Sequence, residues 1–419
     1  MNIKELYKLY CQYYLVDTDT RKIRNNTLYF ALKGENFNGN TFAEEALKKG
    51  ASYSIVDEKE YVTSSKTILV DDVLSSLQKL ASHHRSTLNI PIIGLTGSNG
   101  KTTTKELINT VLSTQYNTTA TIGNLNNHIG VPLTLLSMTP STEIGIVEMG
   151  ANHHKEIDFL CSIAKPDFGY ITNFGKAHLE GFGSIEGVIE AKSELYNYLR
   201  KNKKTVFVNP DDKIQVLKTT EMNIAFFDAS IILLEANPYV KIKFNIEKIV
   251  TTNLIGAYNY SNIAAAITFG ISFKIYPKNI KSSLASYIPT NNRSQVLVTK
   301  NKNTLILDAY NANPTSMIAA LDSFSLINSK NKMVILGDMF ELGLESQKEH
   351  QYISDYCTVL NLKSVILVGK QFNKTTSDHL TLASVDDLKQ HLTKANITDS
   401  QILIKGSRGM ALERVTAFL

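Results

Sequence analysis

A glycine-rich segment at residues 94–104 (GLTGSNGKTTT) has the residue types that a nucleotide-phosphate site needs. Glycines let backbone N–H groups turn inward around phosphate oxygens, Lys101 can reach terminal phosphates, and Thr102 can hold Mg²⁺. The spacing departs from G-x-x-x-x-G-K-[ST], because Leu95 stands where the first glycine would be. A Gly/Asn turn with a solvated lysine is the alternative. We predict ATP or GTP binding, with these contacts: Gly97, Ser98, Asn99, Gly100, Lys101, Thr102 and Thr103.

The flanking residues predict the elements that must position this loop. An apolar run at 90–95 precedes it, and helical apolar spacing follows at Leu107, Val111 and Leu112. Strand, loop and helix is the order that a phosphate site requires. Glu148 ends a second apolar run, so a strand would deliver it to the carboxyl edge of the same sheet, where it suits Mg²⁺. The alternative is a strand-end glutamate that pairs with a lysine.

Lys192 lies on an apolar helical stripe. In residues 185–199 the apolar positions are 185, 188, 189, 195, 196 and 199, and helical spacing places position 192 on the same inward face. Burial lowers a lysine's pKa and leaves a neutral amine that can react with CO₂. The alternative is a lysine whose stem packs while its ammonium reaches water.

Composition predicts a multidomain globular protein. The chain has 419 residues, 43% of them apolar, and a formal net charge of +5. Roughly 100–200 residues per domain gives two to four domains. Three scattered cysteines and no long apolar run predict a cytoplasmic protein without disulfides or membrane insertion. The short basic run at 200–204 is better explained as a solvated turn than as a nucleic-acid groove.

Alternating strand and helix signals predict an α/β fold with three domains, at residues 1–87, 88–288 and 289–419. The first is a small α/β domain, the second a parallel sheet with crossover helices, and the third a doubly wound unit that ends in a helix at 408–418. Polar patches at 81–89 and 289–293 are the candidate boundaries. The predicted strands are 27–32, 52–56, 90–95, 144–149, 169–172, 205–208, 304–307, 333–336, 364–368 and 401–404.

The phosphate loop and several other segments together resemble the Mur ligase and folylpolyglutamate synthase superfamily of ATP-dependent amide-forming enzymes. The matching segments are 18–21 (TDTR), 30–34 (FALKG), 123–132 (GNLNNHIGVP), 148–152 (EMGAN), 171–173 (ITN), 177–183 (AHLEGFG), 256–259 (GAYN), 308–314 (DAYNANP), 337–343 (GDMFELG) and 405–410 (KGSRGM). The resemblance implies an N-terminal UDP-sugar-binding domain, a central domain like that of P-loop ATPases and a Rossmann-like C-terminal ligase domain.

The C-terminal segments are most similar to the branch that adds D-alanyl-D-alanine to UDP-N-acetylmuramoyl-tripeptide. The implied chemistry is carboxylate activation by ATP to an acyl phosphate, attack by the dipeptide amine, and release of ADP and phosphate. The nearest alternatives are a related Mur ligase that adds a single amino acid and a folylpolyglutamate synthase that adds glutamate to a pterin. An ATP-driven switch that forms no bond is the alternative from another class. We expect a monomer with no nucleic-acid partner.

The resemblance also implies roles for individual residues. His178 and Lys192, the latter as a carbamate, would hold a second Mg²⁺ beside the one at Thr102 and Glu148. The implied catalytic residues are Lys101, Glu148, His178, Lys192 and Arg293. Further nucleotide contacts are expected from Asn259, Asn262, Arg293 and Asp308, whose alternative role is turn chemistry.

Substrate contacts are expected in two places. For the UDP-peptide they are Thr18, Thr20, Arg21, Lys33, Asn124, Asn126 and Asn127; for the pocket around the dipeptide they are Asn311, Asn313, Lys405, Ser407 and Arg408. Cations at a helix start could hold the dipeptide carboxylate or a phosphate. The sequence departs from the family at 153–155, where His-His-Lys precedes Glu156 and a glycine is usual. Neighbouring histidines point in different directions, so the pairs at 83–84 and 153–154 are given no metal role.

Overall fold

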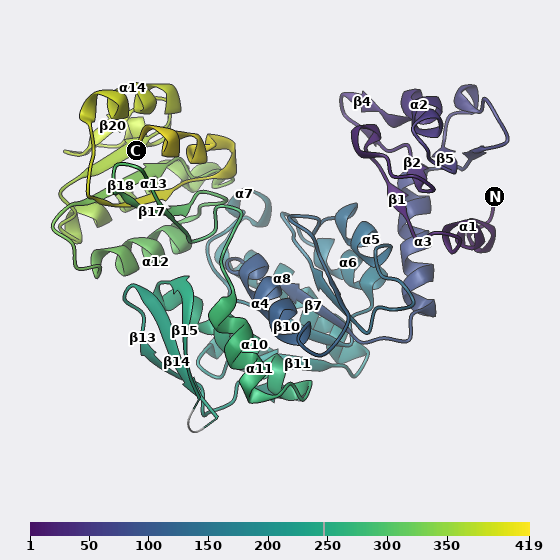
Figure 1. Ribbon diagram of the computed structural model, residues 1–419, viewed down its shortest axis with the longest axis horizontal. Helices are drawn as coiled ribbons and strands as arrows, with labels where there is room; N and C mark the ends of the chain where they lie inside the picture. Colours follow the sequence, from purple (N-terminus) through teal and green to yellow (C-terminus); the bar gives the residue numbers. More distant parts are fainter. Residues whose placement is uncertain (246–247) are drawn as a thin grey trace.

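The computed structural model describes residues 1–245 and 248–419 and consists of three α/β units, each built on its own sheet (Figure 1). The central unit lies in the middle of the view, with the N-terminal unit above it on one side and the C-terminal unit above it on the other. This arrangement agrees with the predicted three-domain α/β class. Among the described residues, no helix is long and apolar enough to cross a membrane.

The N-terminal unit is a small parallel sheet with a short hairpin. The sheet order is β1 (Val16–Asp17), β2 (Leu28–Phe30), β5 (Tyr53–Val56) and β6 (Thr67–Leu69), and the hairpin pairs β3 (Lys33–Gly34) with β4 (Phe37–Asn38). Its helices are α1 (Ile3–Tyr10), α2 (Ala43–Lys48) and α3 (Val73–Thr87).

Helix α3 joins the N-terminal unit to the central unit and packs against α5 (Gly130–Leu135) and α6 (Glu156–Ala164). Arg85 is buried on this helix, donates to the Ala164 carbonyl and pairs with Asp167 at 2.7 Å. The polar patch at 81–89 is therefore mostly a packed helix end. The proposed boundary thus lies at a helix end whose Arg85 bonds to the central unit.

The central unit holds the six-stranded parallel sheet that positions the phosphate loop. Its order is β12 (Asn223–Phe226), β11 (Thr205–Val208), β10 (Phe168–Ile171), β7 (Ile92–Thr96), β9 (Ile144–Glu148) and β8 (Thr118–Ala120). Register pairs Leu95 with Glu148 and Thr96 with Ile171. The carboxyl ends of β7, β9 and β10 therefore meet at one edge, as predicted for Glu148.

Helices and a second sheet complete the central unit. The helices are α4 (Lys101–Leu112), α5, α6, α7 (Leu179–Phe182), α8 (Ile185–Lys201), α9 (Lys213–Lys218), α10 (Tyr260–Ser272) and α11 (Pro277–Ser286). The second sheet is antiparallel and consists of β13 (Ile232–Glu235), β14 (Tyr239–Phe244) and β15 (Lys248–Ile255). Sequence patterns did not identify this sheet. Helix α10 follows it and packs along α4, directly behind the phosphate loop.

The C-terminal unit is a six-stranded sheet in the order β16 (Gln295–Val298), β17 (Thr304–Asp308), β21 (Gln401–Lys405), β18 (Lys332–Gly337), β19 (Val365–Val368) and β20 (Leu380–Leu382). Only β16 runs antiparallel to its neighbour. Its helices are α12 (Pro314–Ser325), α13 (Ser346–Val359) and α14 (Val385–Ala395).

The prediction of one α-helix at 408–418 is wrong. The segment forms two 3₁₀ helices, η7 (Arg408–Met410) and η8 (Leu412–Phe418), separated by Ala411 in the left-handed region at φ 51°. Leu412 and Val415 are nevertheless buried, so the segment still packs against the sheet, with a tighter backbone than the apolar spacing suggested.

Candidate active site

The phosphate loop connects β7 to α4 and has the backbone shape that only glycine allows at two points. Gly97 has φ +140°, and a Cβ there would lie 2.0 Å from Thr172 Oγ1. Gly100 has φ +79°, and a Cβ there would lie 2.5 Å from Asn262 Oδ1. Substitution at either position would therefore force apart the loop and its neighbouring segments.

Residues 172–175 hold the loop from the side. Asn99 N–H donates to Asn173 Oδ1 at 3.0 Å, and the Asn99 carbonyl accepts from Thr172 Oγ1. Ser98 Oγ donates to the Gly175 carbonyl at 2.9 Å and accepts from Gly175 N–H. The side chain of Ser98 thus fixes the loop. The end of the loop that leads into α4, at Gly100 and Lys101, lines the cavity.

Glu148 meets Thr102 as the sequence predicts. Glu148 Oε1 accepts from Thr102 Oγ1 at 3.2 Å and from Asn126 Nδ2 at 2.9 Å. Its other oxygen, Oε2, is buried and has no hydrogen-bond partner among the described residues. An unsatisfied buried carboxylate oxygen beside a hydroxyl matches the ligands that Mg²⁺ prefers. This pair therefore fits the predicted magnesium site.

Two lysines on the first turns of α4 face this region. Lys101 Nζ donates to the carbonyls of Gly97 and Ser98 at 2.7 and 3.2 Å, and burial lowers the pKa of Lys101. Lys105 lies one turn further, with Nζ 2.6 Å from the Thr121 carbonyl and 3.9 Å from Glu148 Oε2. Lys105 was not among the predicted site residues, although its i,i+4 spacing from Lys101 was a readable signal.

Asn259 and Asn262 line the cavity and also connect two helices. Thr104 Oγ1 donates to Asn262 Oδ1 at 2.9 Å, and Asn262 Nδ2 donates to Asn259 Oδ1 at 2.8 Å. Asn259 Nδ2 in turn donates to the Ile255 carbonyl. Much of their hydrogen-bonding capacity thus holds α10 against α4, a positioning role that the sequence did not reveal.

Arg293 enters the cavity from the start of the C-terminal unit. Its guanidinium carbon lies 3.7 Å from the ring centroid of Tyr310, and its buried Nε has no partner in the part of the chain that the structure describes. Stacking on Tyr310 holds the guanidinium plane while leaving donors available for an anion. Tyr310 lies inside the 308–314 segment, and its contact with Arg293 was not predicted from the sequence.

Asp308 and Lys405 come together at the ends of β17 and β21. Lys405 Nζ is 2.6 Å from Asp308 Oδ2, and Asp308 Oδ1 accepts from Ser294 N–H at 3.2 Å. The Lys405 side chain is only 2% exposed, and it also donates to the Asn311 carbonyl. Lys405 and Asp308, both predicted to contact ligands, therefore largely neutralise each other's charge within the protein.

The remaining C-terminal site residues differ in how free their side chains are. Asn313 caps α12 and donates through Nδ2 to Asn99 Oδ1 at 2.7 Å, so the C-terminal unit directly contacts the phosphate loop. Ser407 Oγ accepts from Phe340 N–H at 2.9 Å. Arg408 pairs with Glu413, but its side chain is 59% exposed and lines the cavity.

Lys192 is completely buried, which excludes the alternative of an ammonium that reaches water. Its Nζ donates to the Ala151 carbonyl at 3.0 Å and lies 5.0 Å from the Phe182 ring centroid. Burial, with added repulsion from Lys101, lowers the pKa of Lys192 well below its usual value. These surroundings favour the neutral amine that carbamate formation needs.

His178 contacts the C-terminal unit. Its Nδ1 forms a short contact with Glu341 Oε2, and this hydrogen bond lowers the pKa of Glu341. Within residues 1–245 and 248–419, no group of three or more His, Cys, Asp or Glu side chains is arranged to hold a metal ion. A second metal site at His178 and Lys192 therefore stays a prediction.

Lys155 stands where the family usually has glycine, and the backbone there has the shape that favours glycine. It has φ +71°, the left-handed region that favours glycine, and it caps α6. Glu194, two residues after Lys192 on α8, accepts from the N–H groups of Lys155 and Asp158 at 2.7 and 2.9 Å. The buried Glu194 carboxylate thus supports a turn for which lysine is an unfavourable residue.

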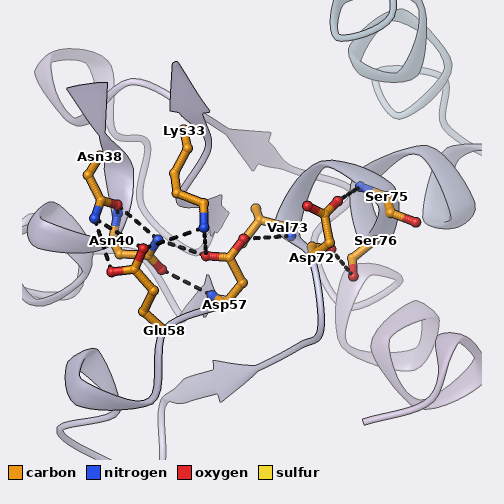
Figure 2. Close-up of polar contacts among 9 residues, drawn as sticks. All are labelled: Lys33, Asn38, Asn40, Asp57, Glu58, Asp72, Val73, Ser75 and Ser76. Carbon is orange, nitrogen blue, oxygen red and sulfur yellow. Dashed lines mark hydrogen bonds and ion pairs between the residues drawn. The ribbon is translucent and has the colours of Figure 1, made fainter. Parts of the chain in front are cut away.

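The N-terminal candidates lie apart from this site. Lys33 Nζ is 3.0 Å from Asp57 and 3.4 Å from Glu58, within the polar network that Figure 2 shows. Arg21 is 86% exposed and pairs with Asp19 at 2.7 Å. Thr20 begins the short helix η1 (Thr20–Lys22), and Thr18 precedes it. The N-terminal unit presents these groups on an open surface.

One cavity of about 740 Å³ gathers most of the other candidates between the central and C-terminal units. It is lined by Ser98, Asn99, Gly100, Lys101, Thr102, Thr103, Asn124, Asn126, Asn127, Glu148, His178, Asn259, Asn262, Arg293, Asp308, Asn311, Lys405, Ser407 and Arg408. Its size is typical of a ligand site. Gly97, Lys192 and Asn313 are not among its lining residues, and neither are the N-terminal candidates.

Comparison with known proteins decides the family. Residues 12–89 match the profile "Mur ligase family, catalytic domain", residues 95–270 the Mur ligase middle domain, and residues 292–408 the "Mur ligase, glutamate ligase domain". The UDP-N-acetylmuramoyl-tripeptide--D-alanyl-D-alanine ligase of Bacillus subtilis is 37% identical, over 96% of this chain and 92% of its own length. This chain belongs to the Mur ligase family.

Other Mur ligases match nearly the whole chain. The Escherichia coli ligase of the same name is 31% identical, over 96% of this chain and 93% of its own length. The MurF ligase of Thermotoga maritima, solved in complex with ADP, superposes with a TM-score of 0.84 at 27% identity, covering 96% of both chains. A MurF structure from Acinetobacter baumannii also gives 0.84 at 28% identity, covering 96% of this chain and 92% of that one. The predicted family and three-domain fold are confirmed.

Proposed function

We propose that this Mur ligase joins D-alanyl-D-alanine to UDP-N-acetylmuramoyl-tripeptide at the expense of ATP. The observation that carries the proposal is the shared cavity, where the phosphate loop and Glu148 of the central unit face Arg293 of the C-terminal unit. The relatives from Bacillus subtilis and Escherichia coli carry the name of this activity, and the Thermotoga maritima neighbour was solved with ADP.

The first step transfers a phosphoryl group. A carboxylate oxygen of the tripeptide attacks the γ-phosphorus of ATP, the bond to the β,γ-bridging oxygen breaks, and ADP leaves, giving an acyl phosphate. The obstacle is the approach of one anion to another, so the site must supply positive charge around the transferring group. Lys101, the N–H groups of the loop and Arg293 are placed at the cavity wall for this purpose.

The second step forms the peptide bond. The dipeptide's neutral amine attacks the acyl carbon, phosphate leaves as the C–O bond breaks, and the nitrogen loses a proton to solvent or phosphate. Arg408 is the best candidate for the dipeptide carboxylate, because its guanidinium is exposed at the cavity while Lys405 is paired with Asp308. We assign Lys405 and Ser407 to the support of this wall, and Asn311 to its lining.

Magnesium is part of the proposal. Thr102 and Glu148 would hold one ion, and His178 with a carbamylated Lys192 would help to hold a second. Bound magnesium supplies positive charge that stabilises the phosphates. Glu148 Oε2 has Lys105 Nζ at 3.9 Å but accepts no hydrogen bond among the described residues, which leaves it available to a metal ion. The buried surroundings of Lys192, which favour its neutral form, also support this assignment. Asn126 keeps Glu148 oriented through its hydrogen bond.

The N-terminal unit is proposed to anchor the UDP end of the substrate. Thr18, Thr20, Arg21 and Lys33 offer polar groups on an open surface, whereas Asn124 and Asn127 line the cavity where the peptide end would enter. We propose functional domains at 1–87, 88–288 and 289–419 in a protein that acts as a monomer.

The three cysteines of the chain are free, which is consistent with a protein that acts in the reducing cytoplasm.

Phosphate release tests the proposal. Purified protein with ATP and magnesium should release phosphate only when both UDP-N-acetylmuramoyl-tripeptide and D-alanyl-D-alanine are present, and the product should gain the mass of the dipeptide. Tripeptides that end in lysine or in diaminopimelate should be assayed separately. Full-rate release from ATP alone would instead indicate a switch protein, and incorporation of a single amino acid would indicate a sibling ligase.

A further inference from the structure

Residues 173–178 lie between the phosphate loop and the C-terminal unit. On one side Asn173 and Gly175 bond to the phosphate loop as described above. On the other side Lys176 N–H donates to Thr315 Oγ1, at the start of α12, at 3.0 Å. Gly175 permits this close approach, since a Cβ there would lie 3.0 Å from Asn99 Nδ2 and 3.1 Å from Thr315 Oγ1.

Lys176 also forms an ion pair with the C-terminal unit. Its Nζ lies 2.6 Å from Oε1 of Glu349, which belongs to the first turn of α13. The Glu349 side chain is 5% exposed, whereas that of Lys176 is 49% exposed. Neither residue lines the cavity, so neither is placed to touch a substrate there.

The burial of Glu349 makes this pair different from ordinary surface pairs. A buried carboxylate that loses its cation is strongly destabilised, because neither water nor another charge replaces the partner. On the same helix, Lys348 pairs with Glu345 at 3.1 Å, but those side chains are 77% and 49% exposed. That pair lies within one unit and is exposed to water, so its loss should have little effect.

We propose that Lys176 and Glu349 are a positioning pair that holds the C-terminal unit against the phosphate loop in the arrangement that completes the active site. The inference rests on the proposed function. Because residues 173–178 bond both to the loop and to the C-terminal unit, a shift of that unit would move Arg293 and Arg408 away from the phosphate loop. Amide formation needs such alignment more than nucleotide binding does.

Charge reversal tests the pair. Lys176→Glu and Glu349→Lys should each lower kcat/KM for D-alanyl-D-alanine by roughly 10- to 100-fold, the loss typical of small misplacements. Both variants should still bind a non-hydrolysable ATP analogue, and small-angle scattering with that analogue should show a larger radius of gyration than the wild type. The double exchange K176E/E349K should recover most of the lost activity and the compact scattering.

Milder variants keep the test decisive if charge reversal prevents folding. Lys176→Met and Glu349→Gln should show the same direction of change, with the larger loss for Lys176→Met because it leaves the buried carboxylate unpaired. Lys348→Met is the matched control and should behave as the wild type. Wild-type kinetics in Lys176→Met, or a double exchange no better than either single variant, would overturn the proposal.

The outcomes also separate this inference from the proposed function. If the wild type forms no amide bond while the scattering still differs between Lys176→Met and Lys348→Met, the positioning pair stands and the proposed reaction fails. If the wild type ligates the dipeptide and Lys176→Met is unchanged in both readouts, the reaction stands and the pair fails.

Discussion

The interdomain cavity and the N-terminal surface handle polar side chains in opposite ways. In the cavity, groups far apart in sequence meet: Asn313 bonds to Asn99, 214 residues away, and Lys405 bonds to Asp308, 97 residues away. On the N-terminal surface, Arg21 pairs with Asp19, two residues away, and its side chain remains 86% exposed.

This difference indicates that the cavity is suited to catalysis and the N-terminal surface to substrate binding. Phosphoryl transfer needs preoriented charges in a region of restricted water, so its groups must be fixed by long-range packing. Anchoring one end of a long substrate needs only accessible polar groups on a unit that stays attached to the central domain. Substitutions in the cavity should therefore be costly for rate or stability, and substitutions on the N-terminal surface should mainly affect substrate affinity.

The largest expected effect separates the two regions directly. Lys101→Ala removes the loop cation and should lower turnover about 100- to 1000-fold, the range for loss of a preoriented charge-stabilising donor. Binding of the UDP-tripeptide, measured by calorimetry without nucleotide, should change little because its anchor lies on another unit. Equal loss of turnover and of UDP-tripeptide affinity would contradict the division between the two regions.

Lys192→Ala should have the next largest effect. Loss of a group that positions a metal typically costs roughly 10- to 100-fold in activity. Formate or acetate in the buffer should restore part of the rate, since a short carboxylate can replace a carbamate in the space left by the side chain. Lys201→Ala, an exposed position on the same helix, is the control. Full activity of Lys192→Ala without any carboxylate would exclude the carbamate.

Stability should also distinguish the two regions. Asp308→Ala leaves the buried Lys405 ammonium unpaired and should lower the free energy of unfolding of the C-terminal unit by about 3 kcal/mol. Arg21→Ala breaks an exposed pair and should leave the denaturation midpoint unchanged. Urea denaturation followed by circular dichroism measures both. Equal midpoints for Asp308→Ala and the wild type would mean that burial of this pair does not matter for folding.

The smallest effect concerns backbone strain beside the cavity. Lys155→Gly relieves a lysine from the left-handed region, and we expect a gain of about 0.5–1 kcal/mol in the free energy of unfolding. Lys79→Gly is the matched comparison, because it lies exposed inside α3 and should lose about 1 kcal/mol. A loss of stability in Lys155→Gly as well as in Lys79→Gly would contradict the inference that lysine is unfavourable in this turn.

Local patterns in the sequence predicted much of this molecule. The strand, loop and helix around Lys101 were readable because their apolar runs and glycines are contiguous, and the inward face of Lys192 followed from helical spacing. The antiparallel sheet β13–β15 was missed although Val240, Ile242 and Phe244 alternate with lysines on β14, which is a readable strand signal. Only β13 lacks such a pattern, with Ile232 and Leu234 exposed. The segment 408–418 was predicted as one helix but forms two 3₁₀ helices, because 3₁₀ and α-helical spacing are hard to separate over so few residues.

The sequence by itself determined the residue types at the active site, the phosphate loop and the family to which the chain belongs. Only the tertiary structure decided which of those residues are free to meet a ligand. Lys405 and Asp308 carry opposite charges that neutralise each other once β17 and β21 lie side by side, and Lys176 meets Glu349 only when the C-terminal unit is in place. The reason is physical: local spacing sets the face on which a side chain lies, whereas its partners and its access to water depend on segments distant in the chain.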